Sequence, residues 1–238
     1  MTDDEVLDRM AAVGPWVHPI EFRGRVYRDP GAGPDRLFSG LVRETRAARF
    51  YDAFPDARRV LELGTLEAAD TVRLASRPGV SVVSIEGRPE NLRRAQFVLD
   101  LHGLNNVELV SAELESFDLA TLGRFAAVLC SGILYHLVEP WKLVARLAGV
   151  TDRVYLWTHY WDGPHALTPE AGFLVKTVQE QFPEPRLRGL SSYARWFDRA
   201  SLFRVLRENG FSAAVLDERG HGSVREVTLA CSRHGGAV

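Results

Sequence analysis

Short apolar runs alternate with amphipathic stretches along the chain from residue 57 to residue 232. The runs are rich in β-branched residues and have the length of buried strands, whereas most stretches between them carry apolar residues at helical spacing. This pattern predicts strands in seven segments, at residues 57–64, 80–87, 106–110, 124–132, 152–160, 212–220 and 225–232. It predicts helices between them at residues 66–79, 89–104, 139–149 and 198–211.

Punctuating residues mark several of these boundaries. Pro89 stands where a helix begins and Gly103 where it ends, while Asp198 is suited to cap the last helix, which Asn209 and Gly210 terminate. Strands that alternate with helices form βαβ units, which require right-handed crossovers and a mainly parallel sheet. The sequence therefore predicts an α/β fold with a doubly wound, mostly parallel seven-stranded sheet and helices on both faces. The last two strands have no helix between them, so we expect an antiparallel C-terminal hairpin at one edge.

The first part of the chain lacks this alternation of predicted strands and helices. A helical stretch over about Asp3–Val13 precedes a segment punctuated by proline and glycine, and a second helical pattern runs from Asp35 to Phe54. We therefore expect an N-terminal helical cap, or substrate-lid extension, at residues 1–55 and a sheet domain at residues 56–238. Residues 160–195 of the sheet domain carry prolines and aromatic residues, and an insertion of this length is typical of a lid over a substrate.

Composition narrows the function mainly by exclusion. The 238 residues are 46% hydrophobic and 25% charged, and 29 basic and 31 acidic residues give a formal net charge of −2. That balance argues against binding nucleic acid through bulk charge. Two cysteines, Cys130 and Cys231, are too few for a disulfide framework. The acidic N-terminus is unlike a signal peptide and no run of 18 apolar residues occurs, so we expect a cytoplasmic protein without a membrane partner.

Small and acidic residues follow the predicted strands at their carboxyl ends, where a doubly wound sheet binds ligands. Gly64 allows a tight turn after the first strand, and the Glu62 carboxylate can accept hydrogen bonds from a polar or cationic ligand. Glu86 ends the second strand, 22 residues beyond Gly64, where a carboxylate can accept both hydroxyls of a ribose. The next two strands are followed by residue pairs placed for an adenine edge and for the reacting end of the ligand, namely Ala112–Glu113 and Ser131–Gly132.

These residues and their spacing resemble the class I S-adenosylmethionine-dependent methyltransferases. The resemblance covers about residues 59–232 and rests on the segments VLELGTLEAA, VVSIEGRPENLRRA, FAAVLCSGILYHLVEPWKLV and WFDRASLFRVLRENGF. It implies a Rossmann-like fold, with S-adenosyl-L-methionine as the cofactor and S-adenosyl-L-homocysteine as the product. It also implies that the methionine part of the cofactor is held by Glu62, Gly64 and Thr65. The ribose is then held by Glu86, Gly87 and Arg88, and the adenine by Ala112 and Glu113.

The turn after the first strand departs from the family pattern. The family has two or three glycines there, whereas this chain reads Gly64-Thr65-Leu66-Glu67-Ala68. Because alanine does not adopt a positive φ cheaply, we expect a turn of different shape. This departure leaves open a protein that keeps the fold but lacks transfer activity.

Two further segments, GILYHLVEP and the leader PWVHPIEF, resemble a narrower group within this family. That group comprises the tRNA wobble-uridine methyltransferase-like proteins and related natural-product methyltransferases. The leader carries His18, which is a substrate-binding candidate if the leader folds over the site.

Histidine is the side chain best suited to remove a proton from a methyl acceptor near neutral pH. His136 follows the fourth strand and His159 follows the fifth, so we expect both to face the ligand crevice as catalytic residues. Aromatic side chains gather at the same mouth and predict a flat, apolar acceptor pocket, with substrate-binding candidates Tyr135, Tyr160 and Trp161. We expect no metal, because the carboxylates that metal-dependent relatives use after the fourth and fifth strands are replaced here by Cys-Ser-Gly and Thr-His-Tyr.

Three functional hypotheses remain. The first is a methyltransferase that acts on oxygen or nitrogen of a small molecule in a biosynthetic pathway, which the near-neutral charge favours; a homodimer is compatible with it. The second is a tRNA-modifying enzyme, whose basic surface would come from three arginine groups, Arg23/Arg25/Arg28, Arg43/Arg46/Arg49 and Arg186/Arg188/Arg195. The third is a non-catalytic partner protein with the methyltransferase fold.

Overall fold

The computed structural model describes residues 2–29, 46–163, 165–181 and 184–233, and its centre is a seven-stranded sheet of strand order β11-β12-β7-β6-β3-β4-β5. Five neighbouring strands run parallel, namely β3 (Arg59–Leu63), β4 (Ser81–Glu86), β5 (Val107–Ser111), β6 (Ala127–Ser131) and β7 (Arg153–Trp161). An antiparallel hairpin completes the sheet at one edge, formed by β11 (Phe211–His221) and β12 (Val224–Arg233). The predicted sheet and its C-terminal hairpin are confirmed.

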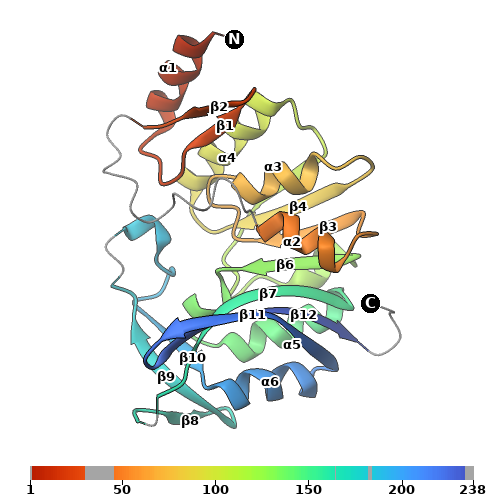
Figure 1. Cartoon of the computed structure of the whole chain (residues 1–238), viewed down its shortest axis with the longest axis vertical. Helices are drawn as coiled ribbons and strands as arrows, with labels where there is room; N and C mark the ends of the chain where they lie inside the picture. Colours follow the sequence, from red (N-terminus) through yellow and green to blue (C-terminus); the bar gives the residue numbers. More distant parts are fainter. Residues whose placement is uncertain (1, 30–45, 164, 182–183, 234–238) are drawn as a thin grey trace.

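Helices cover both faces of this sheet (Figure 1). One face packs against α2 (Arg46–Ala53) and α3 (Ala69–Ala75), with α4 (Pro89–His102) beside them. The other packs against α5 (Pro140–Val150) and α6 (Arg199–Glu208). Successive strand residues point to opposite faces, so Leu61 enters the layer of α5 and α6 while Val60 enters the layer of α2 and α3. Burial on both faces explains the continuous apolar strands of the sequence.

The punctuating residues act as expected. Pro89 is the first residue of α4, and Gly103 caps its C-terminus with a φ of 66°. The Asp198 side chain accepts a hydrogen bond of 2.8 Å from the Ser201 backbone amide at the start of α6. Three short 3-10 turns connect other elements: η1 (Leu119–Leu122), η2 (Leu134–His136) and η3 (Pro185–Leu187).

The N-terminal part contains the predicted helix, α1 (Asp3–Val13), and a hairpin that the sequence pattern did not indicate, β1 (Ile20–Phe22) with β2 (Arg25–Tyr27). Both lie against α4, where the Trp16 ring meets the Phe97 ring edge-on at 5.8 Å between centroids (Figure 1). Of the second predicted helix, residues 46–53 form α2, and residues 35–45 lie outside the described residues.

The predicted lid insertion contains a small antiparallel sheet of its own. Its strands are β8 (Thr168–Glu170), β9 (Phe173–Gln179) and β10 (Tyr193–Phe197), in the order β10-β9-β8. Phe173 and Phe197 anchor this sheet in the core next to α6. No helix in the described part of the chain is long and apolar enough to cross a membrane.

Candidate active site

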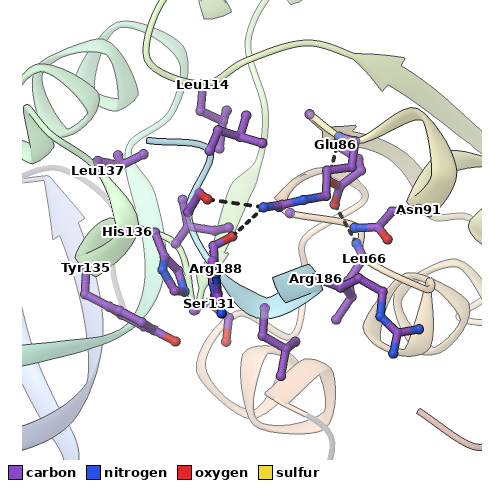
Figure 2. Close-up of a pocket in the computed structure, with 18 of the residues that line it drawn as sticks. Leu66, Glu86, Asn91, Leu114, Ser131, Tyr135, His136, Leu137, Arg186 and Arg188 are labelled. Atoms are coloured by element: carbon purple, nitrogen blue, oxygen red, sulfur yellow. Dashed lines mark hydrogen bonds between the residues drawn. The ribbon is translucent and has the colours of Figure 1, made fainter. Parts of the chain in front are cut away.

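A cavity of about 630 Å³ lies at the carboxyl ends of the parallel strands, at the point where the strand order reverses between β3 and β6. Glu86, Leu66 and Asn91 lie on one side of it, and Tyr135 and His136 on the other (Figure 2). The cavity brings together most of the residues expected from the sequence, namely His18, Glu62, Gly64, Thr65, Glu86, Gly87, Arg88, Ala112, Ser131, Gly132, Tyr135, His136 and His159.

Three expected residues do not line this cavity. Glu113 is exposed beside it. Tyr160 points to the opposite face of β7 from His159, because side chains alternate along a strand, and its hydroxyl donates to the Glu218 carboxylate. Trp161 lies past the cavity at the end of β7, where its indole N–H donates to the His165 carbonyl. The side of the cavity where we expect the acceptor is walled instead by Tyr135 together with Trp157 and Trp196, which belong to the same aromatic cluster in the sequence.

The turn after β3 reaches its conformation without the missing glycines. Gly64, Leu66 and Ala68 have φ values of 81°, 49° and 63°, so every second residue is left-handed. Ala68 therefore adopts the positive φ that is costly for alanine. The turn holds Leu66 and Ala68 in a conformation that costs roughly 1–2 kcal/mol per non-glycine residue, and surrounding contacts offset that cost.

We expect Gly64→Ala to destabilise the protein and to weaken cofactor binding. An added Cβ would lie 2.3 Å from the Ile133 Cδ1 atom, on a backbone with a φ of 81°. Strain of roughly 1–2 kcal/mol predicts a melting temperature lower by a few degrees. The matched control is Gly149→Ala in α5, where an added Cβ meets nothing within 4 Å and alanine favours the helix. Thermal melts that fall equally for both variants would contradict this assignment.

Glu86 is held as an acceptor for a ligand. Its Oε2 atom accepts from the Leu66 backbone amide and its Oε1 atom from the Arg88 backbone amide, each at 2.9 Å (Figure 2). A carboxylate has about four lone-pair sites, so two remain for hydroxyl groups in the cavity. The Arg88 side chain reaches the lid, donating to the carbonyls of Arg188 at 2.9 Å and Gly189 at 3.2 Å.

Glu62 lies at the bottom of the cavity and is buried. Its Oε2 atom accepts hydrogen bonds of 2.6 Å from the hydroxyls of Thr71 and Ser84, and the Thr65 hydroxyl lies 2.5 Å from that of Ser84. Burial raises the pKa of Glu62 to about 8, against the opposing effect of the two hydroxyl donors. A cationic ligand would draw Glu62 toward its ionised form.

The cavity wall has polar groups and close approaches that fit a nucleoside-containing cofactor. Ser131 Oγ, Asn91 Nδ2 and His159 Nδ1 are buried without a hydrogen-bond partner among the described residues, and all three side chains line the cavity. Gly87 lets the Leu190 side chain of the lid approach the backbone closely, since a Cβ on residue 87 would lie 2.6 Å from Leu190 Cδ1. Together with the two carboxylates at neighbouring strand ends, this set fits the amino-acid, ribose and adenine parts of S-adenosylmethionine.

Two segments from outside the sheet close the cavity. Glu67 in the turn accepts from the backbone amides of Val17 at 2.8 Å and His18 at 2.7 Å, which holds the N-terminal leader over the site. Arg186 of the lid donates to the Pro15 carbonyl, so leader and lid are joined. The leader therefore folds over the site, and His18 lines the cavity.

The acceptor side of the cavity is aromatic. The rings of Tyr135 and His159 stack at 4.2 Å with an angle of 11°, while Trp157 and Trp196 meet His159 edge-on at 5.1 and 5.2 Å. Burial, followed by the charges of His136 and Arg46, lowers the pKa of His159 to about 4. His159 is therefore a neutral imidazole at physiological pH.

His136 has a partner that the sequence analysis missed. Its Nδ1 atom lies 3.0 and 3.1 Å from the two carboxylate oxygens of Glu180, which also accepts from the Gly189 backbone amide at 2.8 Å. Burial acts to raise the pKa of the Glu180 carboxyl, but the hydrogen bonds from His136 and the Gly189 amide, together with the charges of His136 and Arg88, hold it below its usual range. Glu180 follows β9 and is 44 residues from His136 along the chain, so no local motif joins them.

Similarity to solved structures identifies the family. The N-terminal domain of EvdMO1, crystallised with bound S-adenosylhomocysteine, is 47% identical, with a TM-score of 0.90 and 98% of each chain covered. The chain belongs to the class I S-adenosylmethionine-dependent methyltransferases. Like its relatives, the methyltransferase uses S-adenosylmethionine and releases S-adenosylhomocysteine. It spans about half of full-length EvdMO1, with 41% identity, a TM-score of 0.77, and 97% of this chain and 47% of that chain covered.

More distant structures share the fold of the methyltransferase. Magnesium protoporphyrin IX methyltransferase from Synechocystis, with bound S-adenosylmethionine, is 16% identical with a TM-score of 0.52, covering 78% of this chain and 75% of that one. The 1,6-didemethyltoxoflavin-N1-methyltransferase of Burkholderia thailandensis is 20% identical with a TM-score of 0.54, covering 79% and 76%. No protein-family model and no curated protein matches the sequence. No group of three His, Cys, Asp or Glu side chains in the described ranges could hold a metal ion.

Proposed function

We propose that this methyltransferase transfers its methyl group to a hydroxyl of a small molecule in a biosynthetic pathway, with His136 as the base. The observation that carries the proposal is the contact of His136 Nδ1 with both carboxylate oxygens of Glu180 at the cavity wall. A carboxylate only accepts, so Nδ1 carries the proton and Nε2 is free to take a proton from an acceptor. Glu180 is then a positioning residue that fixes the imidazole in this tautomer.

His136 is better suited to this role than His159. The His159 imidazole, with its pKa near 4, has little tendency to take up a proton at neutral pH. Its stacking between aromatic rings fits a wall of the acceptor pocket instead.

When bound, the cofactor supplies a methyl group that is already activated for displacement. The task of the protein is therefore to place the acceptor in line and to remove its proton. Glu62 and Glu86 line the cavity and would hold the cofactor there, and the leader and lid lie over the cavity, which limits the access of water. Positioning of this kind supplies on the order of 7–11 kcal/mol, and a general base adds about 10²–10⁴-fold in rate.

A small, ring-shaped polyol is the acceptor that this pocket suits best. Tyr135, Trp157 and Trp196 offer flat apolar surfaces for the C–H faces of a ring, next to an imidazole that takes the hydroxyl proton. The similar EvdMO1 domain was also crystallised in the presence of S-adenosylhomocysteine and D-fucose. A 6-deoxyhexose is therefore the first acceptor class to test.

Four of the nine arginines that favoured a tRNA substrate pair with carboxylates in the described residues. Each sequence group contains arginines within 4 Å of a carboxylate, as seen for Arg25 with Asp3, Arg49 with Asp217, Arg186 with Glu184 and Arg195 with Glu170. Arg43 lies outside the described residues. This pairing supports a small acceptor over nucleic acid as the partner of the methyltransferase.

Release of S-adenosylhomocysteine from S-adenosylmethionine tests the proposal directly. We expect turnover with 6-deoxyhexoses or their glycosides and none with unmodified tRNA, and mass spectrometry of the product should place the methyl on oxygen. A methylated amine, or methylated tRNA with binding that weakens steeply with salt, would contradict the proposal.

A further inference from the structure

We propose that Arg46, Tyr135 and Ser131 form a carboxylate-binding site beside Gly132, at the end of β6. Arg46 belongs to one of the arginine groups expected to form a basic surface, yet its side chain lines the cavity. Its guanidinium carbon lies 3.8 Å from the centre of the Trp157 ring. A Cβ on Gly132 would lie 3.5 Å from Arg46 Nη1 and 3.8 Å from the Tyr135 hydroxyl, so both groups face the same small volume.

The polar groups at this point are donors that lack acceptors. No hydrogen bond or ion pair joins the Arg46 guanidinium, or the Tyr135 hydroxyl, to another residue in the described ranges. Ser131 Oγ is buried there without a partner. Stacking on Trp157 uses the face of the guanidinium and leaves its N–H edge free. A planar anion with two oxygens is the ligand that such an edge binds best.

Asp70 is an acidic residue whose charge interacts with that of Arg46, and Glu180 and Glu226 act on Tyr135. Asp70 also lines the cavity, but its Oδ1 atom accepts from the Ala47 backbone amide at 3.1 Å, and burial raises the pKa of Asp70, which favours its neutral form. Burial also raises the pKa of Tyr135 to about 12, so its hydroxyl remains a donor. The Arg46 guanidinium and the Tyr135 hydroxyl therefore both remain donors on this side of the cavity.

Two molecules could bring a carboxylate to this position. β6 lies between β3, whose turn we expect to face the amino-acid part of the cofactor, and β7, which contributes Trp157 and His159 to the aromatic wall. The anion is therefore either the amino-acid carboxylate of the cofactor or a carboxylate on the acceptor. Neither alternative depends on which atom of the acceptor is methylated, so this inference stands apart from the choice of a hydroxyl acceptor.

Calorimetric titration of Arg46→Met separates the two sources. The probes are S-adenosylhomocysteine and 5′-deoxy-5′-methylthioadenosine, which has the same nucleoside and thioether but no amino acid. A loss of about 10–100-fold in affinity for the first probe alone assigns the site to the cofactor carboxylate. Unchanged affinity for both, with benzoate binding to cofactor-saturated wild type but not to the variant, assigns it to the acceptor.

Controls make the remaining outcomes decisive. Arg49→Met makes the same change one turn along α2, where Arg49 lies 3.7 Å from Asp217, and should bind all probes like wild type. Tyr135→Phe removes one donor and should weaken the same probe by a smaller factor. If Arg46→Met proves unstable in thermal melts, Arg46→Lys keeps the charge without the planar fork and should give an intermediate loss. Equal losses for both nucleosides, or no change with any probe, would overturn the proposal.

Discussion

Replacing His136 with asparagine is expected to lower kcat by about 10²–10⁴-fold toward a hydroxyl acceptor, with little change in the affinity for S-adenosylhomocysteine. A hydroxyl oxygen is a poor nucleophile until its proton is removed, and His136 Nε2 is the group left free for this step by the contact of Nδ1 with Glu180. Asparagine is smaller but polar, so the cavity wall should keep its shape. Steady-state rates and calorimetric titration of the same preparations measure the two effects separately.

The pH dependence of the rate tests the role of His136 as the base more directly than the size of the rate loss does. In the wild type, a step that needs a general base should make kcat/KM depend on pH. His136→Asn should flatten this dependence. Glu180→Gln should lower kcat/KM, because an amide can donate to the imidazole and stabilise the wrong tautomer.

Two results would contradict the role of His136. An unchanged pH profile in His136→Asn would move the base elsewhere, and an equally large loss with an acceptor that needs no deprotonation would indicate a purely structural role. His221→Asn is the matched control, since His221 is exposed at the end of β11 and does not line the cavity. We expect this control to behave like wild type.

The sheet could be predicted because its strands carry their own signal. Burial on both faces makes β3, β4 and β6 predominantly apolar runs, and proline or glycine marks adjoining helices. The hairpin of β1 and β2 could not be found in this way. Each of its strands has three residues, and alternation over three residues is too short to separate a strand from a loop.

The site residues also differ in whether they could be predicted from the sequence. Glu62, Gly64 and Glu86 are found from sequence, because the topology alone brings strand ends together. Glu180, Glu67 and Arg46 come from a lid, a turn and a helix, whose positions depend on tertiary packing. Tyr160 shows the reverse error: it ends a strand near the cavity, but a shift of one residue along a strand turns its side chain to the other face.

Glu62→Gln should make the ligand-free protein more stable at high pH while it weakens cofactor binding. The pKa of Glu62 rises from an ordinary 4.5 to about 8 in the folded chain, so the folded state holds a proton that the unfolded state releases. Stability from this group is therefore fully present below pH 4.5 and is lost as the pH rises to about 8, on the order of 1 kcal/mol per pH unit. Glutamine does not titrate, and its amide oxygen can still accept from Thr71 and Ser84.

Thermal melts from pH 5 to pH 9 measure this difference. The melting temperature of the variant should exceed that of the wild type by a growing margin up to about pH 8, by several degrees at the upper end. Titration should show the opposite order for the cofactor, because only the ionised carboxylate attracts the cationic groups of S-adenosylmethionine, and affinity for the wild type should increase toward pH 8. Parallel melting curves for the two proteins would mean that Glu62 is already ionised in the free enzyme. The expected opposite effects on stability and binding follow from one cause: the buried carboxyl is costly to ionise until a cation occupies the cavity. The residue that destabilises the empty site is therefore also the one that we expect to hold the cofactor.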